Sequence, residues 1–223
     1  MRTTNPVLNA KTFANVKQIE GAPVMTIEGT VNRTAFLLLI LSATATWTWM
    51  EAFIGAPVGG YLLAGIAGGF VVGLITVFSP GIARFTAPIY AALEGLALGA
   101  ISAIYEAQFH GIVIQAVALT FGVLFALLII YRLRILPVTQ NFKLGICAAT
   151  GGIALFYLIA IGLSFFGVQI GMLHQGTPLG IGFSLFVITI AALNLVLDFD
   201  FIEQGVHQGA PKLMEWYAAF GLV

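Results

Sequence analysis

The stretch LNLVLDFDFIEQG, residues 193–205, places two aspartates at the end of a long apolar segment. That segment begins near Leu179 and is long enough to cross a bilayer, so Asp198 and Asp200 lie in its final turns. A carboxylate in a membrane costs free energy unless it is paired, protonated or hydrated, so it marks a functional site by default. We therefore interpret the rest of the chain as a scaffold that holds these acids.

The composition indicates a polytopic α-helical membrane protein. Of the 223 residues, 60% are hydrophobic and only 8% are charged, whereas about 25% are charged in an ordinary soluble domain. The formal net charge is +0, which gives no reason to expect nucleic acid as a partner. The single cysteine, Cys147, excludes an intrachain disulfide.

Six segments are long and apolar enough to cross the hydrocarbon core, which takes about 20 residues. They span roughly 35–54, 58–78, 86–105, 111–131, 144–167 and 179–201. A seventh begins near Leu213 and stops at Val223 after about 11 residues, too few to cross, so either the chain is a fragment or this segment lies along the interface. We expect an all-α polytopic membrane bundle of six full transmembrane helices plus a truncated seventh, with 1–34 as an N-terminal tail and 35–223 as one bundle domain.

The basic residues predict the orientation of these segments. All nine Lys and Arg fall before the first segment or in alternate loops, and hence on one side of the membrane. They are Arg2, Lys11, Lys17 and Arg33 before the first segment, Arg84 after the second, Arg132, Arg134 and Lys143 after the fourth, and Lys212 after the sixth. The positive-inside rule makes this side, and with it the N-terminal tail, cytoplasmic.

The two aspartates occupy different helix faces, because residues three or four apart share a face. Asn194 lies one turn before Asp198, whereas Val196 and Leu197 lie one turn before Asp200. We therefore expect Asp198 to point into the bundle with Asn194 as a supporting polar residue, and Asp200 to lie nearer headgroup water. A solvated carboxylate at a helix end is the alternative for both, and the weightier one for Asp200.

A third intramembrane acid, Glu94, lies about eight residues into the third segment, roughly 12 Å deep at 1.5 Å per residue. Glu94 and Asp198 both fall in the cytoplasmic half, so they could share a site if the third and sixth segments are neighbours. Arg84, in the loop PGIARFTAP, falls on the same side. It could act as a latch by binding a carboxylate bidentately, or it could be an anchor that obeys the positive-inside rule.

The sequence contains no glycine-flanked nucleophilic serine, no HExxH motif, no phosphate-binding loop and no histidine or cysteine cluster with metal spacing. We therefore expect no enzymatic activity and no resident cofactor.

Two segments carry a family resemblance: TAPIYAALEGLALGAIS, residues 86–102, and LNLVLDFDFIEQGVHQGAP, residues 193–211. In both, the chain resembles the Bax inhibitor / YccA-like membrane proteins, the transmembrane Bax inhibitor motif family. The resemblance implies a seven-helix bundle with a pH-sensitive calcium leak, governed by a pair of aspartates on the last two helices. For bacterial relatives it implies association with a membrane-bound AAA protease, and we expect this chain in a bacterial inner membrane.

The family's sixth-helix acid corresponds best to Asp198, with Asp200 as an extra acid or the alternative registration. The partner acid should lie midway along the seventh helix, beyond Val223. Either this second acid is missing through truncation, or Glu94 or Glu215 takes over part of its role.

Two functions of different classes remain. The first is a pH-sensitive calcium (cation) leak channel gated by Asp198, Asp200 and Glu94. Hard cations prefer carboxylate and carbonyl oxygens, so Asp198 and Asp200 are candidate ligands for calcium as the permeant ion. Burial and a neighbouring carboxylate both disfavour the charged form, so such acids can titrate near physiological pH. The alternative is a non-conducting membrane regulator that binds a membrane protease or another membrane complex, with its polar tail as a handle.

The predicted orientation can be tested by labelling. A cysteine introduced at His174, in the predicted outer loop, should react with an impermeant maleimide in intact cells. Labelling only after permeabilisation would reverse the orientation.

Overall fold

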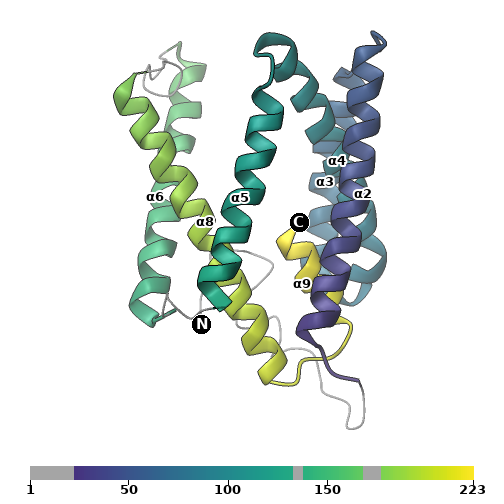
Figure 1. The fold of residues 1–223 in the computed structure, drawn as a ribbon, viewed down its shortest axis with the longest axis vertical. Coiled ribbons are helices and arrows are strands. Elements are labelled where there is room, and N and C mark those ends of the chain that lie inside the picture. Colours follow the sequence, from purple (N-terminus) through teal and green to yellow (C-terminus); the bar gives the residue numbers. More distant parts are fainter. Residues whose placement is uncertain (1–22, 133–137, 168–176) are drawn as a thin grey trace. The chain divides into compact units, whose positions relative to one another are not determined.

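The computed structural model describes residues 23–132, 138–167 and 177–223, and the regular structure in them is helical (Figure 1). The helices are α2 (Ile27–Phe53), α3 (Gly59–Phe78), the short 3-10 helix η1 (Pro80–Ile82), α4 (Ala83–Gln108), α5 (Ile112–Arg132), α6 (Gln140–Phe165), α8 (Pro178–His207) and α9 (Met214–Leu222). The predicted all-α class is confirmed.

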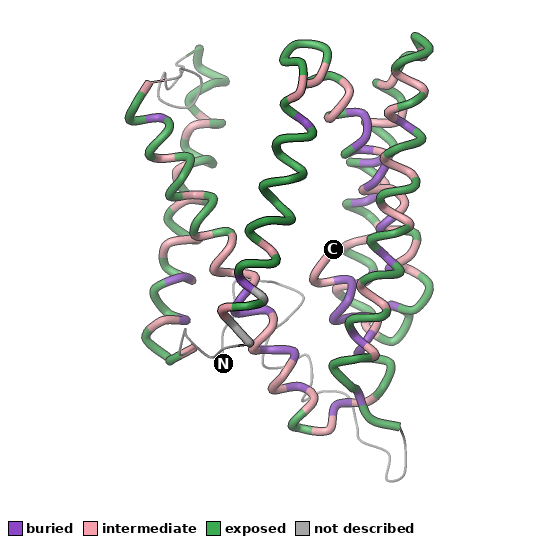
Figure 2. The backbone as a smooth tube through the Cα atoms, in the orientation of Figure 1, coloured by how far each residue is buried: buried purple, intermediate pink, exposed green. Residues whose placement is uncertain are grey.

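Five of the described helical segments are long and apolar enough to cross a membrane: α2, α3, α4 together with η1, α6 and α8. A sixth helix, α5, is apolar over Ile112–Leu127. Exposed residues run along most of the length of these helices in Figure 2, and many carry large apolar side chains, such as Phe70, Ile114 and Leu185. This is the surface expected of helices in contact with lipid. The number of spans and the orientation stay predictions.

The chain divides into two compact units, which are described separately. Of the described residues, 23–122 and 201–223 form the α2–α4 unit, and 123–132, 138–167 and 177–200 form the α6–α8 unit. Helices α5 and α8 each contribute residues to both units.

Capping residues, rather than hydropathy, determine where two of the helices begin. Helix α2 starts at Ile27, inside the predicted tail, because the Thr26 side chain accepts a hydrogen bond from the backbone N–H of Gly29 at 3.0 Å. Helix α6 starts at Gln140 because the Thr139 side chain accepts from the N–H of Phe142 at 3.2 Å. Both helices therefore begin before their apolar segments, and α6 includes Lys143 in its first turn.

In the α2–α4 unit, α4 packs closely against α2 through Gly95 and Gly99. A Cβ atom at Gly95 would collide with the Leu41 carbonyl oxygen and the Thr44 side chain, and one at Gly99 would collide with the Ala45 carbonyl oxygen. Small residues allow such backbone approach where lipid removes the hydrophobic effect between helices. The glycine pair of α4 is therefore the contact surface for α2.

The other face of α4 receives glycines from α3. A Cβ at Gly65 would lie 2.7 Å from the Leu93 carbonyl oxygen, and one at Gly69 would lie 3.2 Å from Oε1 of Glu94. Helix α4 is thus held between α2 and α3, with glycine at both contacts.

The apolar core of this unit brings together α2, α4, the end of α8, and α9. The short α9 packs beside α2 and α4 (Figure 1). The buried core residues are Met25, Leu37, Ala83, Ala87, Ala91, Phe201, Ile202, Ala210, Met214, Tyr217, Ala218, Ala219 and Phe220.

The packing predicts opposite effects for two glycine substitutions. Gly95→Ala should lower the free energy of unfolding by about 1–3 kcal/mol, because the new methyl group has no room against α2. Gly151→Ala in α6 should be neutral or stabilising by up to ~1 kcal/mol, because nothing lies within 4 Å of its Cβ position and alanine favours helix. Thermal unfolding of the detergent-solubilised variants measures the difference, and equal effects would contradict the close contact.

Candidate functional site

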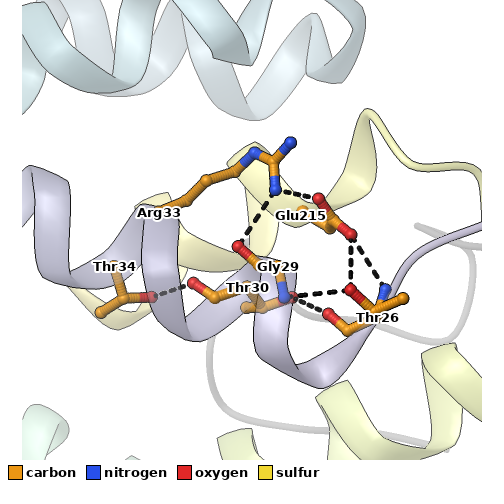
Figure 3. Close-up of polar contacts among 6 residues, drawn as sticks. All are labelled: Thr26, Gly29, Thr30, Arg33, Thr34 and Glu215. Atoms are coloured by element: carbon orange, nitrogen blue, oxygen red, sulfur yellow. Dashed lines mark hydrogen bonds and ion pairs between the residues drawn. The ribbon is translucent and has the colours of Figure 1, made fainter.

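A fully buried carboxylate, that of Glu215, joins α9 to the start of α2 (Figure 3). Its Oε1 accepts hydrogen bonds from the backbone N–H and the hydroxyl of Thr26, both at 3.0 Å. Its Oε2 forms an ion pair with Nη1 of Arg33. The Glu215 side chain is 0% exposed and that of Arg33 is 22% exposed, so the acid is compensated inside the protein rather than by bulk water.

The local sequence of α2 is suited to receive this carboxylate. A Cβ at Gly29 would lie 2.6 Å from Oε2 of Glu215, so only glycine leaves room for it. Nη1 of Arg33 also donates to the Gly29 carbonyl oxygen at 3.0 Å. The Arg33 guanidinium lies 5.3 Å from the centre of the Trp216 ring, a cation–π distance. Arg33 is therefore held by both α2 and α9.

Backbone hydrogen bonds fix the segment that leads into α9. The N–H of Met25 donates to the carbonyl oxygen of Ala210 at 2.6 Å. The N–H of Lys212 donates to the carbonyl oxygen of Pro23 at 2.9 Å. The residues just before α2 and just before α9 thus pair like neighbouring strands over a single antiparallel bridge, Val24–Pro211.

In the α6–α8 unit, the acids of the LDFD stretch differ in their surroundings. Asp198 is buried, with 9% of its surface exposed. The carboxylate of Asp200 lies 2.5 Å from Nζ of Lys143 on α6, and the side chains of Asp200 and Lys143 are 20% and 10% exposed. The sequence suggested headgroup water as the environment of Asp200. The structure instead gives its carboxylate a cation within the protein.

Asn194 also connects α8 with α6. Its side-chain amide donates to the Thr150 hydroxyl at 2.7 Å and to the Ile190 carbonyl oxygen at 2.9 Å. Asn194 lies one turn before Asp198, so a polar contact with α6 holds the helix face on which Asp198 lies.

Glu94 is half-buried on α4, where its carboxylate faces Gly69 of α3. Tyr90 lies one turn earlier on α4. Gly95 and Gly99, next to Glu94 on α4, pack against α2. Glu94 belongs to the α2–α4 unit and Asp198 to the α6–α8 unit. A site shared by the two acids stays a prediction.

Arg84 lies near the start of α4, with its guanidinium 4.7 Å from the centre of the Phe85 ring. Its function as a latch for an acid stays a prediction. His174 lies outside the described residues.

Within the described ranges, no three His, Cys, Asp or Glu side chains are grouped so that they could hold a metal ion. Binding of calcium by Asp198 and Asp200 stays a prediction, and it would draw further oxygen ligands from carbonyl groups and water.

Sequence reasoning missed Lys143 and underrated Arg33 and Glu215 as parts of charged sites. The available signals were Thr26 and Thr139, because a threonine before a periodic segment is a typical N-cap. Those caps place Arg33 and Lys143 inside helices, where their side chains can reach a partner on another helix.

The buried ion pair predicts a large effect of one conservative change. Glu215→Gln should lower the free energy of unfolding by about 3–5 kcal/mol, because it leaves Arg33 without its buried counter-charge. Glu28→Gln is the control: Glu28 is an exposed acid in the first turn of α2, so the loss should stay below about 1 kcal/mol. Thermal unfolding of both variants makes the comparison. Equal losses would show that Glu215 does not hold α9 in place.

Comparison with known proteins finds one family. The chain matches the family described as "Bax inhibitor 1 like" over residues 5–223. Neither the curated proteins nor the solved structures contain a significant match to it. The family match includes both segments that carried the resemblance and all the described helices. The chain therefore belongs to the Bax inhibitor 1 like family.

Proposed function

We propose that this integral, multi-pass membrane protein is a pH-sensitive cation leak channel with calcium as the permeant ion and Asp198 as its principal gating carboxylate. The proposal assigns no enzymatic activity and no resident cofactor. It places the protein in a bacterial inner membrane, as the resemblance implies. The observation that carries it is the burial of Asp198 on the long apolar helix α8, two residues before Asp200, which pairs with Lys143.

The two aspartates have different functions in this proposal. The charge of Asp200 is compensated by Lys143, which links α8 to α6 and makes Asp200 an anchor. Asp198 lies two residues away on another face of α8 and is the more buried of the two. Gaining or losing a proton there changes the number of buried charges, which costs free energy.

A change of that kind can shift the balance between two packing arrangements of a helix. The free energy of burying the charged carboxylate differs between the two arrangements. The equilibrium between them shifts by this difference. Protons and calcium would act through the same carboxyl oxygens, because a hard divalent cation binds the ionised form. Glu94 is a second candidate acid for this gate.

Calcium flux in proteoliposomes, measured at several pH values, tests the proposal. Wild-type protein should show a flux that changes several-fold with pH, and in Asp198→Asn the ratio of fluxes at the two extremes should approach one. Asp200→Asn should keep the pH dependence but unfold at a lower temperature, because Lys143 loses its partner. Glu28→Gln, which changes an exposed acid on α2, should behave like wild type in both measurements.

Two outcomes would contradict this assignment. Loss of pH dependence in Asp200→Asn alone would transfer the sensing function to Asp200. No wild-type flux above that of empty liposomes at any pH would reject the leak. The non-conducting regulator would then be tested by deleting residues 1–30 and measuring association with a membrane AAA protease.

A further inference from the structure

A pocket of about 420 Å³ opens in the α2–α4 unit, where α2, η1, the start of α4 and the start of α9 meet. Its described lining consists of three basic residues, two aromatic residues, one leucine and one glycine. They are Arg33, Gly81, Arg84, Phe85, Lys212, Leu213 and Trp216. The proposed cation leak does not depend on this pocket.

The charge of the pocket is strongly positive. Three cations line it, and the described lining contains no acid. Glu215 pairs with Arg33 from outside that lining, while no ion pair of Arg84 or Lys212 with a described residue is found. Arg84 and Lys212 are both exposed, so neither charge is neutralised by a described residue and both are available to an anionic ligand.

The Arg33 side chain is already held by contacts within the protein. Nη1 is used by Glu215 and by the Gly29 carbonyl oxygen. Nε is buried, and it has no hydrogen-bond partner among the described residues. Because Nε has almost no accessible surface, a ligand in the pocket does not reach it, and Arg33 acts on the pocket through its positive charge.

The apolar residues of the lining indicate which kind of anion fits. Phe85 and Leu213 are exposed, at 62% and 41%, and Trp216 packs against Arg33. Aromatic side chains with basic neighbours are typical of the membrane–water interface, and basic pockets at the cytoplasmic ends of helices bind lipid headgroups. A free phosphate would use the three cations but leave these apolar side chains uncovered.

We propose that this pocket binds the phosphate group of an anionic phospholipid, with its acyl chains along Phe85 and Leu213. Arg84 donates to the phosphate oxygens in the paired geometry of a guanidinium, and Lys212 contributes a point charge. Arg33 adds its positive charge while it keeps its ion pair with Glu215. The lipid then connects α9 to α4, next to the contact that joins α9 to α2.

The test uses the full chain in a neutral detergent with Trp47→Phe and Trp49→Phe, which leave Trp216 as the only tryptophan. The ligands are dioctanoyl phosphatidylglycerol, dioctanoyl phosphatidylcholine and inorganic phosphate, followed by Trp216 fluorescence and by the unfolding temperature. Phosphatidylglycerol should change the fluorescence saturably and raise the unfolding temperature by several degrees, because a ligand of the folded state stabilises it. The other two ligands should have little effect.

Three variants separate the pocket from net charge. Arg84→Gln/Lys212→Gln should weaken the affinity for phosphatidylglycerol at least tenfold, whereas the charge-keeping Arg84→Lys/Lys212→Arg should stay within about threefold of wild type. Phe85→Ala keeps every charge and removes an apolar side chain from the pocket lining, so it should weaken binding by reducing the contact with the acyl chains.

Each opposite result overturns a stated part of the proposal. Equal affinity of Arg84→Gln/Lys212→Gln and wild type would exclude these cations as the binding groups. Inorganic phosphate acting as strongly as phosphatidylglycerol would show that the anion is not a lipid. An unchanged affinity in Phe85→Ala would show that the acyl chains do not lie along this side chain. Calcium flux does not enter these measurements, so they stand apart from the proposed leak.

Discussion

The α2–α4 unit depends on the burial of one carboxylate, that of Glu215, which is 0% exposed. A buried charge is strongly unfavourable unless an opposite charge and hydrogen bonds compensate it. Arg33 and Thr26 provide that compensation, and Gly29 provides the space. Because all three residues belong to the first turns of α2 or its cap, α9 has to lie against the start of that helix. The apolar core and the basic pocket both adjoin this contact.

A second constraint acts further along the same unit, where glycine replaces side-chain packing with backbone contact. Gly95 and Gly99 allow α2 to approach α4, and Gly65 and Gly69 allow α3 to approach it from the other side. Gly69 also leaves the space that the Glu94 carboxylate faces. The Glu94 carboxylate therefore lies where α3 and α4 pack closely, so a change of its charge acts on tightly packed neighbours.

Helix α8 contributes residues to both units. Its residues up to Asp200 belong to the α6–α8 unit, which they join through Asn194 and the Asp200–Lys143 pair. Its next residues, Phe201 and Ile202, are part of the core of the α2–α4 unit. Asp198 lies among the residues that α8 contributes to the α6–α8 unit.

The sequence by itself determined the membrane class, the helical segments and the family, since hydrophobicity, helix length and motifs such as LDFDFIE are local properties. It also singled out Asp198, Asp200 and Glu94, since an acid in an apolar segment is conspicuous wherever its partner lies. Only the tertiary structure decided which charges meet. Thr26 and Glu215 are 189 residues apart, Arg33 and Glu215 are 182 apart, and Lys143 and Asp200 are 57 apart. The hydrophobic pattern shows that a helix buries a face, but the choice of partner depends on how the helices pack against one another.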